Sequence, residues 1–231
     1  AKSLACSRTG TARDASRTYI ACVIDTEQKL AAFLPKIHAA SWVAVDTEAD
    51  SLHAYPEKVC LIQISTVAGD VLVDPLLRIN LDPMLEALSG HELIMHGADY
   101  DLRLLLKHHK FVPSGIFDTM LAARLLGLRQ FSLSHLVETY LGVKLEKGAQ
   151  KANWALRPLT ERMERYALND THYLKALEEK LKPELAAKGL LPSEQLVDCG
   201  STDAENLRTS QAEHQVRIIG RVADDPSWQA R

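Results

Sequence analysis

Asp46 and Glu48 stand two positions apart, directly after the apolar run Trp42 to Val45. Alternate side chains of an extended strand point to the same side, so this spacing predicts two carboxylates on one strand face. Thr47 is then expected to point the other way. Paired carboxylates supply the oxygen ligands that hard cations such as Mg²⁺ prefer, but acidic residues also end many strands in solvated turns. This pair alone is therefore weak evidence for a metal site.

Three further residues could complete such a site. Tyr166 and Asp170 are four positions apart in a segment with helical spacing, so the phenol and the carboxylate are expected to share one helix face. Asp101 falls in the first turn of a predicted helix after a short apolar strand, where sheets of this type place ligand sites. With Asp46 and Glu48, these residues have the composition and order of a two-metal nuclease site.

Apolar runs indicate the strands that must position these residues. Residues 59–66 and 71–76 are rich in Val, Ile and Leu and flank a short turn, which predicts two strands after the one that bears Glu48. Residues 93–96 are a fourth apolar run, and they lead through Gly97 and Ala98 into a helix.

Helices are expected at several places. Residues 27–37 have helical spacing, and residues 131–142 form a helix capped by Ser132 and closing near Gly142. Asp99 is the expected cap of the helix that carries Asp101. Residues 159–182 are predicted to form one long helix, which bears Tyr166 and Asp170.

Six segments together give a specific resemblance to a known family. They are DTE at 46–48, YPEKVCLIQIS at 55–65, VLVDPL at 71–76, HGADYDL at 96–102, FDTMLAARLLG at 117–127 and NWALRPLTERMERYALNDTHYL at 153–174. With them the chain resembles ribonuclease D, in the DEDD superfamily of 3′-5′ exonucleases, from about residue 24 to residue 183. Tyr166 is typical of the tyrosine-bearing subgroup. Many relatives have Ser-Asp where this chain has Ala152-Asn153, so no substrate contact is carried over to those two positions.

The resemblance implies a fold and an activity. The fold would be α/β and ribonuclease H-like, with a mixed five-stranded sheet, three antiparallel then two parallel strands, and helices on both faces. The activity would be metal-dependent hydrolysis of RNA from a free 3′ end, releasing nucleoside 5′-monophosphates. Transfer RNA precursors would be among the substrates.

The same resemblance implies roles for the site residues. Two divalent ions, Mg²⁺ or Mn²⁺, would be held by the four carboxylates, with Asp46 bridging them. Glu48 and Asp170 would bind the ion that carries the attacking water, and Asp101 would act through the second ion. Tyr166 would orient the attacking water by a hydrogen bond.

Nucleic-acid contacts are assigned to Thr47, His96 and Lys151. Each of the last two has a plainer alternative, because His96 also fits a structural role at a strand end and Lys151, like Lys147, fits a charged surface loop. Trp154 could stack on a base or could anchor the packing of the segment around it.

Composition predicts one domain-sized core. The chain has 231 residues, of which 46% are hydrophobic. Its four cysteines are scattered without a C-x-x-C pair, so reduced thiols are expected. No apolar run approaches the roughly 18 residues of a membrane span. The predicted protein is a cytoplasmic monomer with no membrane association.

The charge of the chain is unevenly distributed. A formal net charge of −3 is not typical of a nucleic-acid-binding protein. Residues 101–182, however, carry more basic than acidic side chains, whereas the segments before and after carry fewer. The basic residues near the third motif are Lys144, Lys147, Lys151, Arg157, Arg162 and Arg165. A polyanion could therefore be met locally, and binding by this chain alone is expected to be modest.

Three regions are expected along the chain. Residues 1–17 are small, polar and aperiodic, as in a disordered leader. Residues 18–190 hold the predicted exonuclease domain, and residues 191–231 have the polar composition of a linker or tail. The helical nucleic-acid-binding domain that follows such a linker in ribonuclease D relatives is expected to be absent.

Two other functions stay open at this point. The same motifs occur in DNA-directed exonucleases, and discrimination needs a contact to the 2′-hydroxyl that the sequence does not locate. The other alternative is a non-catalytic RNA-binding module on the same fold. Such a module would be expected to have lost a carboxylate, whereas all four carboxylates and Tyr166 are present.

Overall fold

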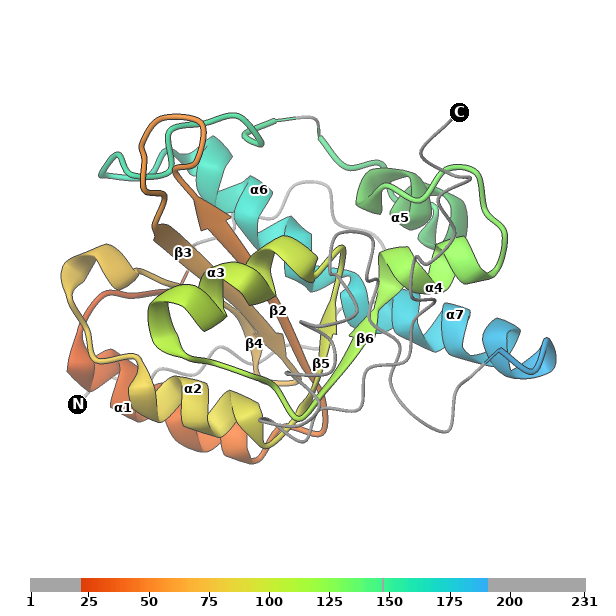
Figure 1. The fold of residues 1–231 in the computed structure, drawn as a ribbon, viewed down its shortest axis with the longest axis horizontal. Helices are drawn as coiled ribbons and strands as arrows, with labels where there is room; N and C mark the ends of the chain where they lie inside the picture. The colour runs from red at the N-terminus through yellow and green to blue at the C-terminus, as the bar shows by residue number, and fades with distance from the viewer. Residues whose placement is uncertain (1–21, 147, 191–231) are drawn as a thin grey trace, which may run out of the picture.

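One mixed sheet organises the protein, in a computed structural model that describes residues 22–146 and 148–190. Its six strands lie in the order β1-β4-β3-β2-β5-β6 (Figure 1). Their bounds are β1 (Cys22–Ile24), β2 (Val43–Ala49), β3 (Val59–Thr66), β4 (Gly69–Val73), β5 (Glu92–Met95) and β6 (Gly115–Asp118). The leader predicted at 1–17 and the tail predicted at 191–231 lie outside the described residues.

Strand pairing follows the predicted mixed topology. β3 pairs antiparallel with both β2 and β4, while β5 and β6 continue the sheet parallel to β2. The predicted number of five strands was one too few, because β1 adds a parallel strand beside β4. β1 has only three residues, too few for an apolar alternation to reveal it in the sequence.

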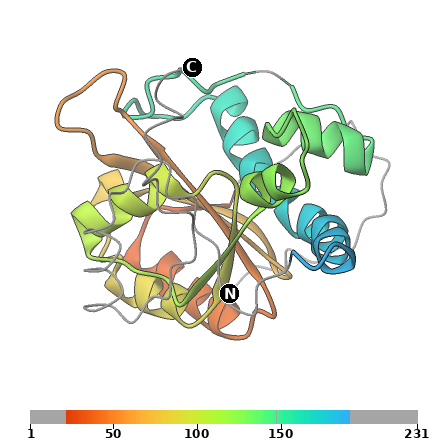
Figure 2. The same ribbon diagram turned by 45° about the vertical axis from the view of Figure 1, so that its right-hand side comes forward.

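Helices cover both faces of this sheet. They are α1 (Glu27–His38), α2 (Asp82–Ser89), α3 (Asp99–His109), α4 (Thr119–Leu125), α5 (Leu133–Leu141), α6 (Glu161–His172) and α7 (Leu174–Ala187), with a 3-10 turn at Pro75–Leu77. The helices predicted at 27–37 and 131–142 are confirmed as α1 and α5. α4, α5 and α7 gather beside the β5–β6 side of the sheet (Figure 2). Among the described residues, no helix combines the length and apolar character needed to cross a lipid bilayer.

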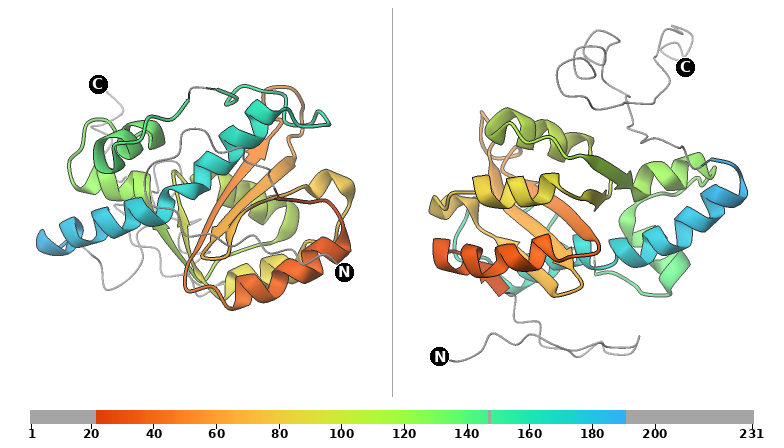
Figure 3. Two further views of the ribbon diagram at one scale, coloured as in Figure 1. Left: turned by 180° about the vertical axis from the view of Figure 1, so that it is seen from behind. Right: turned by 90° about the horizontal axis from the view of Figure 1, so that it is seen from below.

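Alternating side chains of the central strands are buried on opposite faces of the sheet. Val45, Ile62 and Ile64 are buried in a cluster with residues of α1, α2 and α3. Leu61 of β3 is buried on the opposite face, against α6, which crosses that face of the sheet (Figure 3). Glu48 stands opposite Leu61 in the antiparallel register, so the acidic pair of β2 lies on the α6 face.

The single long helix predicted over 159–182 is wrong, because this segment forms two helices. α6 ends at His172 and α7 begins at Leu174, with Tyr173 between them. α6 buries its apolar side against β3 and β4, whereas α7 buries its own against α4 and α5. The apolar stripe therefore changes face at Tyr173, and the helix is interrupted there.

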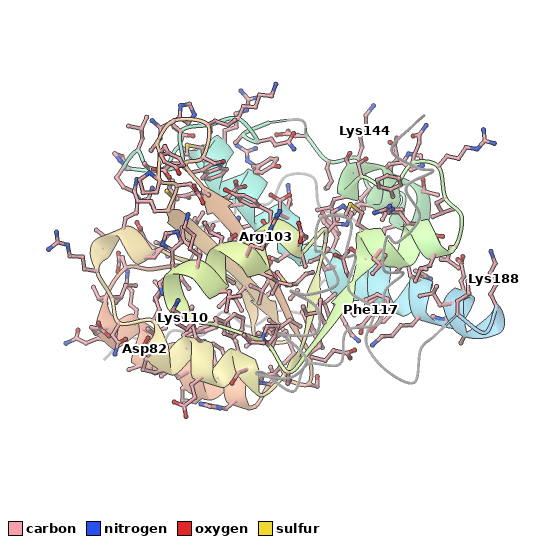
Figure 4. The ribbon with its side chains drawn as sticks, in the orientation of Figure 1. Asp82, Arg103, Lys110, Phe117, Lys144 and Lys188 are labelled. Atoms are coloured by element: carbon pink, nitrogen blue, oxygen red, sulfur yellow. The ribbon has the colours of Figure 1, made fainter. Side chains whose placement is uncertain are left out.

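The helix that carries Asp101 also starts differently from the prediction. Ala98 is the N-cap of α3, and Asp99 is its first residue. The Asp99 carboxylate pairs instead with Arg103, one turn along the helix, at 2.6 Å. Arg103 is labelled on α3 in Figure 4. Asp99 therefore supports the first turn of α3 without capping it.

A buried ion pair fastens the segment before α6 to the sheet. The Arg157 guanidinium donates to both carboxylate oxygens of Asp74, at 2.5 and 2.8 Å, and to the carbonyl oxygen of Cys60 at 2.7 Å. It also donates to the carbonyl oxygen of Trp154 at 2.8 Å. Asp74 follows β4 and Cys60 lies in β3, so one side chain ties this segment to two adjacent strands.

Arg157→Ala is expected to lower the free energy of unfolding by about 3 kcal/mol, because it leaves the buried Asp74 carboxylate without its charged partner. Urea unfolding followed by circular dichroism measures the change. Arg165→Ala is the matched control, since Arg165 is exposed on α6, and it should change stability by less than about 0.5 kcal/mol. Equal losses in the two variants would contradict the proposed clamp.

Candidate active site

The acidic pair of β2 lies where this strand extends beyond its parallel neighbour. β2 pairs with β5 only through Val43 and Ala44. The next residues, Asp46, Thr47 and Glu48, remain paired with β3 on one edge but are not paired with β5 on the other. An uncovered strand edge offers backbone groups to other partners.

Asp101 binds the edge of β2 that β5 leaves unpaired. Its Oδ1 atom accepts hydrogen bonds from the Thr47 backbone N–H, at 3.1 Å, and from the Thr47 hydroxyl. Asp101 is buried in the first turn of α3, beyond the end of β5, where the sequence predicted it. The Thr47 hydroxyl thus donates its hydrogen to Asp101. The nucleic-acid contact assigned to Thr47 stays a prediction.

α6 brings the remaining two residues to the same face. Tyr166 and Asp170 lie one helical turn apart on α6, and burial together with the neighbouring Asp170 carboxylate raises the pKa of the Tyr166 phenol. Carboxylate oxygens of Asp46, Glu48 and Asp170 lie within 4.8 Å of one another. The four predicted carboxylates and the predicted tyrosine therefore converge from three separate elements.

Burial raises the pKa of every carboxylate in this cluster, and mutual repulsion raises it further for three of them. Burial is the larger cause, and neighbouring carboxylates add to it for Asp46, Glu48 and Asp170. The pKa rises to about 9 for Glu48, to about 8 for Asp170, and well above its ordinary range for Asp46. Burial raises the pKa of Asp101 only to about 6, because the hydrogen bonds from Thr47 favour its charged form.

These residues fit a site for divalent cations. The carboxylates supply hard oxygen ligands, and a cation beside them would favour their ionised forms, against the effects that raise their pKa values. When bound, such ions supply a nucleophilic hydroxide and stabilise a leaving oxygen. The protein's own contribution is to fix the ligand oxygens and to hold the Tyr166 hydroxyl beside Asp170.

The cluster opens into a cleft of about 1030 Å³. Its walls come from the segment after β2, the start of α3, the start of α5 and the segment before α6. His96 and Lys151, two of the predicted nucleic-acid contacts, both line this cleft. Lys147 lies outside the described residues. The cleft therefore gives a polymer access to the carboxylates. Among the described residues of its wall, Lys151 is the one lysine or arginine.

His96 and Trp154 are held by the protein itself. The His96 Nδ1 atom lies 2.9 Å from the Thr119 hydroxyl, which donates to the Met95 carbonyl at 3.1 Å. Burial lowers the pKa of His96, which favours the neutral imidazole. Trp154 is only 1% exposed, and its ring lies 6.1 Å from that of Tyr166. Trp154 is therefore a packing anchor beside the site, and the alternative of a base-stacking platform is wrong.

Sequence reasoning missed Asp118, which holds the connection between β5 and α3. Its carboxylate accepts hydrogen bonds from the backbone N–H groups of Gly97, at 2.9 Å, and Ala98, at 2.8 Å, and from two N–H groups at the start of α4. One side chain thus fixes the turn that leads to Asp101. An aspartate at a helix start predicts the bonds to α4, but the bonds to Gly97 and Ala98 join segments distant in sequence.

Comparison with known proteins identifies the family. A family model described as 3′-5′ exonuclease matches residues 22–186, which is most of the chain. The chain belongs to this family. The resemblance to ribonuclease D predicted from the motifs is also confirmed, because ribonuclease D proteins are among the relatives of this chain.

Two relatives show how much of a longer protein this chain matches. Ribonuclease D of Zymomonas mobilis is 33% identical over 220 residues, which cover 89% of this chain and 56% of that protein. Exosome complex component 10 of Rattus norvegicus is 38% identical over 170 residues, which cover 72% of this chain and 19% of that protein. The chain thus spans little more than half the length of the first relative and about a fifth of the second.

Solved structures share the fold. The catalytic core of RRP6 from Trypanosoma brucei matches with a TM-score of 0.70 at 33% identity, covering 75% of this chain and 50% of that one. Escherichia coli RNase D, described as an exoribonuclease involved in structured RNA processing, matches with a TM-score of 0.69 at 31% identity, covering 75% and 47%. The predicted ribonuclease H-like α/β fold is therefore confirmed.

Without metal, the free energy of unfolding is expected to fall as the pH rises from about 4 to about 9. Glu48 and Asp170 hold their protons more tightly in the folded protein, so stability is lost as they ionise between their unfolded pKa values, near 4, and their raised folded values. Thermal unfolding in chelator across this range measures the slope. Mn²⁺ should reverse it, because the cation favours the ionised carboxylates.

Glu48→Gln is the control for this pH dependence, because it removes one of the groups with a raised pKa. Its melting temperature in chelator should fall less steeply with pH than that of the wild type. A wild-type melting temperature that rises with pH in chelator, over the range in which these carboxyls ionise, would contradict the raised pKa values.

Proposed function

We propose that this exonuclease shortens RNA from a free 3′ end, using two divalent cations, Mg²⁺ or Mn²⁺, and releasing nucleoside 5′-monophosphates. The observation that carries the proposal is the convergence of four carboxylates and Tyr166 in one open cleft. Hydrolysis of a phosphodiester needs a hydroxide at neutral pH and compensation of charge on the leaving oxygen, and paired cations supply both. The proposed domain for this activity is residues 18–190.

Each residue of the cluster has a proposed part. Glu48 and Asp170 would hold the cation that supplies the attacking hydroxide, and Asp46 would be a ligand of both cations. Asp101, whose charged form is favoured by Thr47, would act on the second cation through water. Tyr166 would donate a hydrogen bond that orients the attacking water. His96 and Lys151 contact the nucleic acid from the wall of the cleft.

RNA is favoured over DNA by the relatives of this chain. The ribonuclease D and exosome proteins named above match most of the length of this chain. The Escherichia coli enzyme is described as an exoribonuclease. A DNA exonuclease remains the alternative, and the sugar preference is one readout of the test below. A non-catalytic module is disfavoured because no carboxylate of the cluster is lost. Transfer RNA precursors as substrates, a monomeric state and a cytoplasmic location stay predictions from the sequence.

The function is tested with end-labelled single-stranded RNA and DNA of the same sequence, in Mg²⁺, in Mn²⁺ and in chelator. Stepwise shortening of RNA that ends in a 3′-hydroxyl is expected, and RNA that ends in a 3′-phosphate should resist. Cleavage of a circular RNA would show an internal cut and would overturn the proposed direction. Faster degradation of the DNA strand would support the DNA exonuclease instead.

Asp46→Asn should reduce turnover by about 10³-fold or more, because it removes a ligand shared by both cations. The metal-free variant should be as stable as the wild type or more stable, since one repelling carboxylate is gone. Rates from the RNA assay and melting temperatures in chelator measure the two effects. Residual activity within about tenfold of wild type, only 1.4 kcal/mol of barrier, would rule out a bridging role.

Tyr166→Phe should lower kcat by about 10²-fold while leaving the affinities for Mn²⁺ and RNA nearly unchanged. The substitution keeps the ring that packs beside Trp154 and removes only the hydroxyl that is proposed to orient water. Single-turnover rates at increasing Mg²⁺ concentration make the test. A variant that regains the full rate in excess Mg²⁺ would show that Tyr166 supports metal binding and does not orient water.

A further inference from the structure

Gln63, in the middle of β3, is a buried polar residue that the proposed mechanism does not use. Its side chain is fully buried, yet neither its amide nitrogen nor its amide oxygen has a hydrogen-bond partner in the described part of the chain. An unsatisfied buried amide destabilises a fold, so its presence in the interior calls for a physical reason.

The strand register places Gln63 beside the acidic cluster. Gln63 stands directly opposite Asp46 in the antiparallel pairing of β2 and β3. Residues paired in this way point to the same face, with Cβ atoms about 4.5–5.5 Å apart. Two neighbours on β3 identify that face, since Leu61 packs against α6 and the Ser65 hydroxyl donates to Thr171 of α6 at 2.7 Å. α6 crosses this face of the sheet (Figure 3). Gln63 therefore lies between the sheet and α6, on the side of the carboxylates.

Apolar side chains flank Gln63 on two sides. Leu72 stands opposite it on β4, and Leu61 lies two residues before it on the same face of β3. The glutamine amide is two carbon atoms beyond Cβ, which is long enough to reach a carboxylate directly across the strand pair. Its NH₂ group is an uncharged donor, so it can orient a carboxylate without replacing the charge of a cation.

We propose that Gln63 is a positioning residue for the metal site: its amide, which has no partner in the metal-free protein, donates its N–H to the Asp46 carboxylate when cations bind and fixes the orientation in which Asp46 holds them. The inference rests on the metal site of the proposed function. Hydrogen-bond partners of ligating carboxylates contribute about 10–100-fold to metal affinity or activity. Gln63 acts only through Asp46 and touches neither the RNA nor the attacking water.

Gln63→Met tests this role, because methionine has a similar volume and lacks both polar atoms. Its affinity for Mn²⁺, measured by electron paramagnetic resonance of the free ion, should be about 10–100-fold weaker than that of the wild type. Its melting temperature in chelator should be equal or higher, because a buried amide without partners has been removed. Lower affinity with undiminished stability is a result that a purely structural role would not give.

Ser65→Ala is the matched control. Ser65 lies on the same face of β3 but opposite Ala44, and its hydroxyl bonds to α6. This variant should lose thermal stability and keep the wild-type affinity for Mn²⁺. Gln63→Leu is a second apolar substitution that should reproduce the effect of Gln63→Met.

Each outcome has one meaning. If the wild type binds Mn²⁺ and Gln63→Met binds it within about twofold, the positioning role is wrong and the proposed function stands. If the wild type itself binds no Mn²⁺, the proposed metal site fails first. If both apolar variants fail to unfold cooperatively in chelator, Gln63 supports the fold and the positioning role is overturned.

Discussion

Repulsion among buried carboxylates is the constraint on which the rest of this structure depends. Burial and neighbouring charge raise the pKa values of Asp46, Glu48 and Asp170 far above those of free carboxyls. A fold can keep such a cluster only if other interactions hold its elements in place. The end of β2, the first turn of α3 and the middle of α6 are the three elements that must be held.

Each of these elements is fastened by a polar contact to a residue that is not one of the four carboxylates. Asp118 binds the turn before α3, the Thr47 hydroxyl and N–H bind Asp101, and Arg157 binds the segment that leads to α6. Charged groups that accept or donate several hydrogen bonds are the stronger kind of contact, so they suit this task. The cluster can therefore stay assembled at neutral pH, ready for cations that favour its ionised form.

The parts of the site that the sequence predicted are those set by local periodicity. Asp46 and Glu48 follow from the two-residue repeat of a strand, and Tyr166 with Asp170 from the helical turn. The roles of Asp118 and Gln63 depend on contacts between segments distant in sequence, and β1 is too short to show a repeat. Trp154 shows the limit most clearly, because the same residue could stack on a base or anchor the packing until its burial was known.

The central claim is that the cluster holds protons near neutral pH that divalent cations displace. Calorimetric titration of Mn²⁺ in two buffers with different ionisation enthalpies measures the number of protons released on binding. At pH near 7, the account predicts release of about one proton or more per chain, because Glu48 and Asp170 are substantially protonated there. Mn²⁺ binding with no proton release at that pH would contradict it.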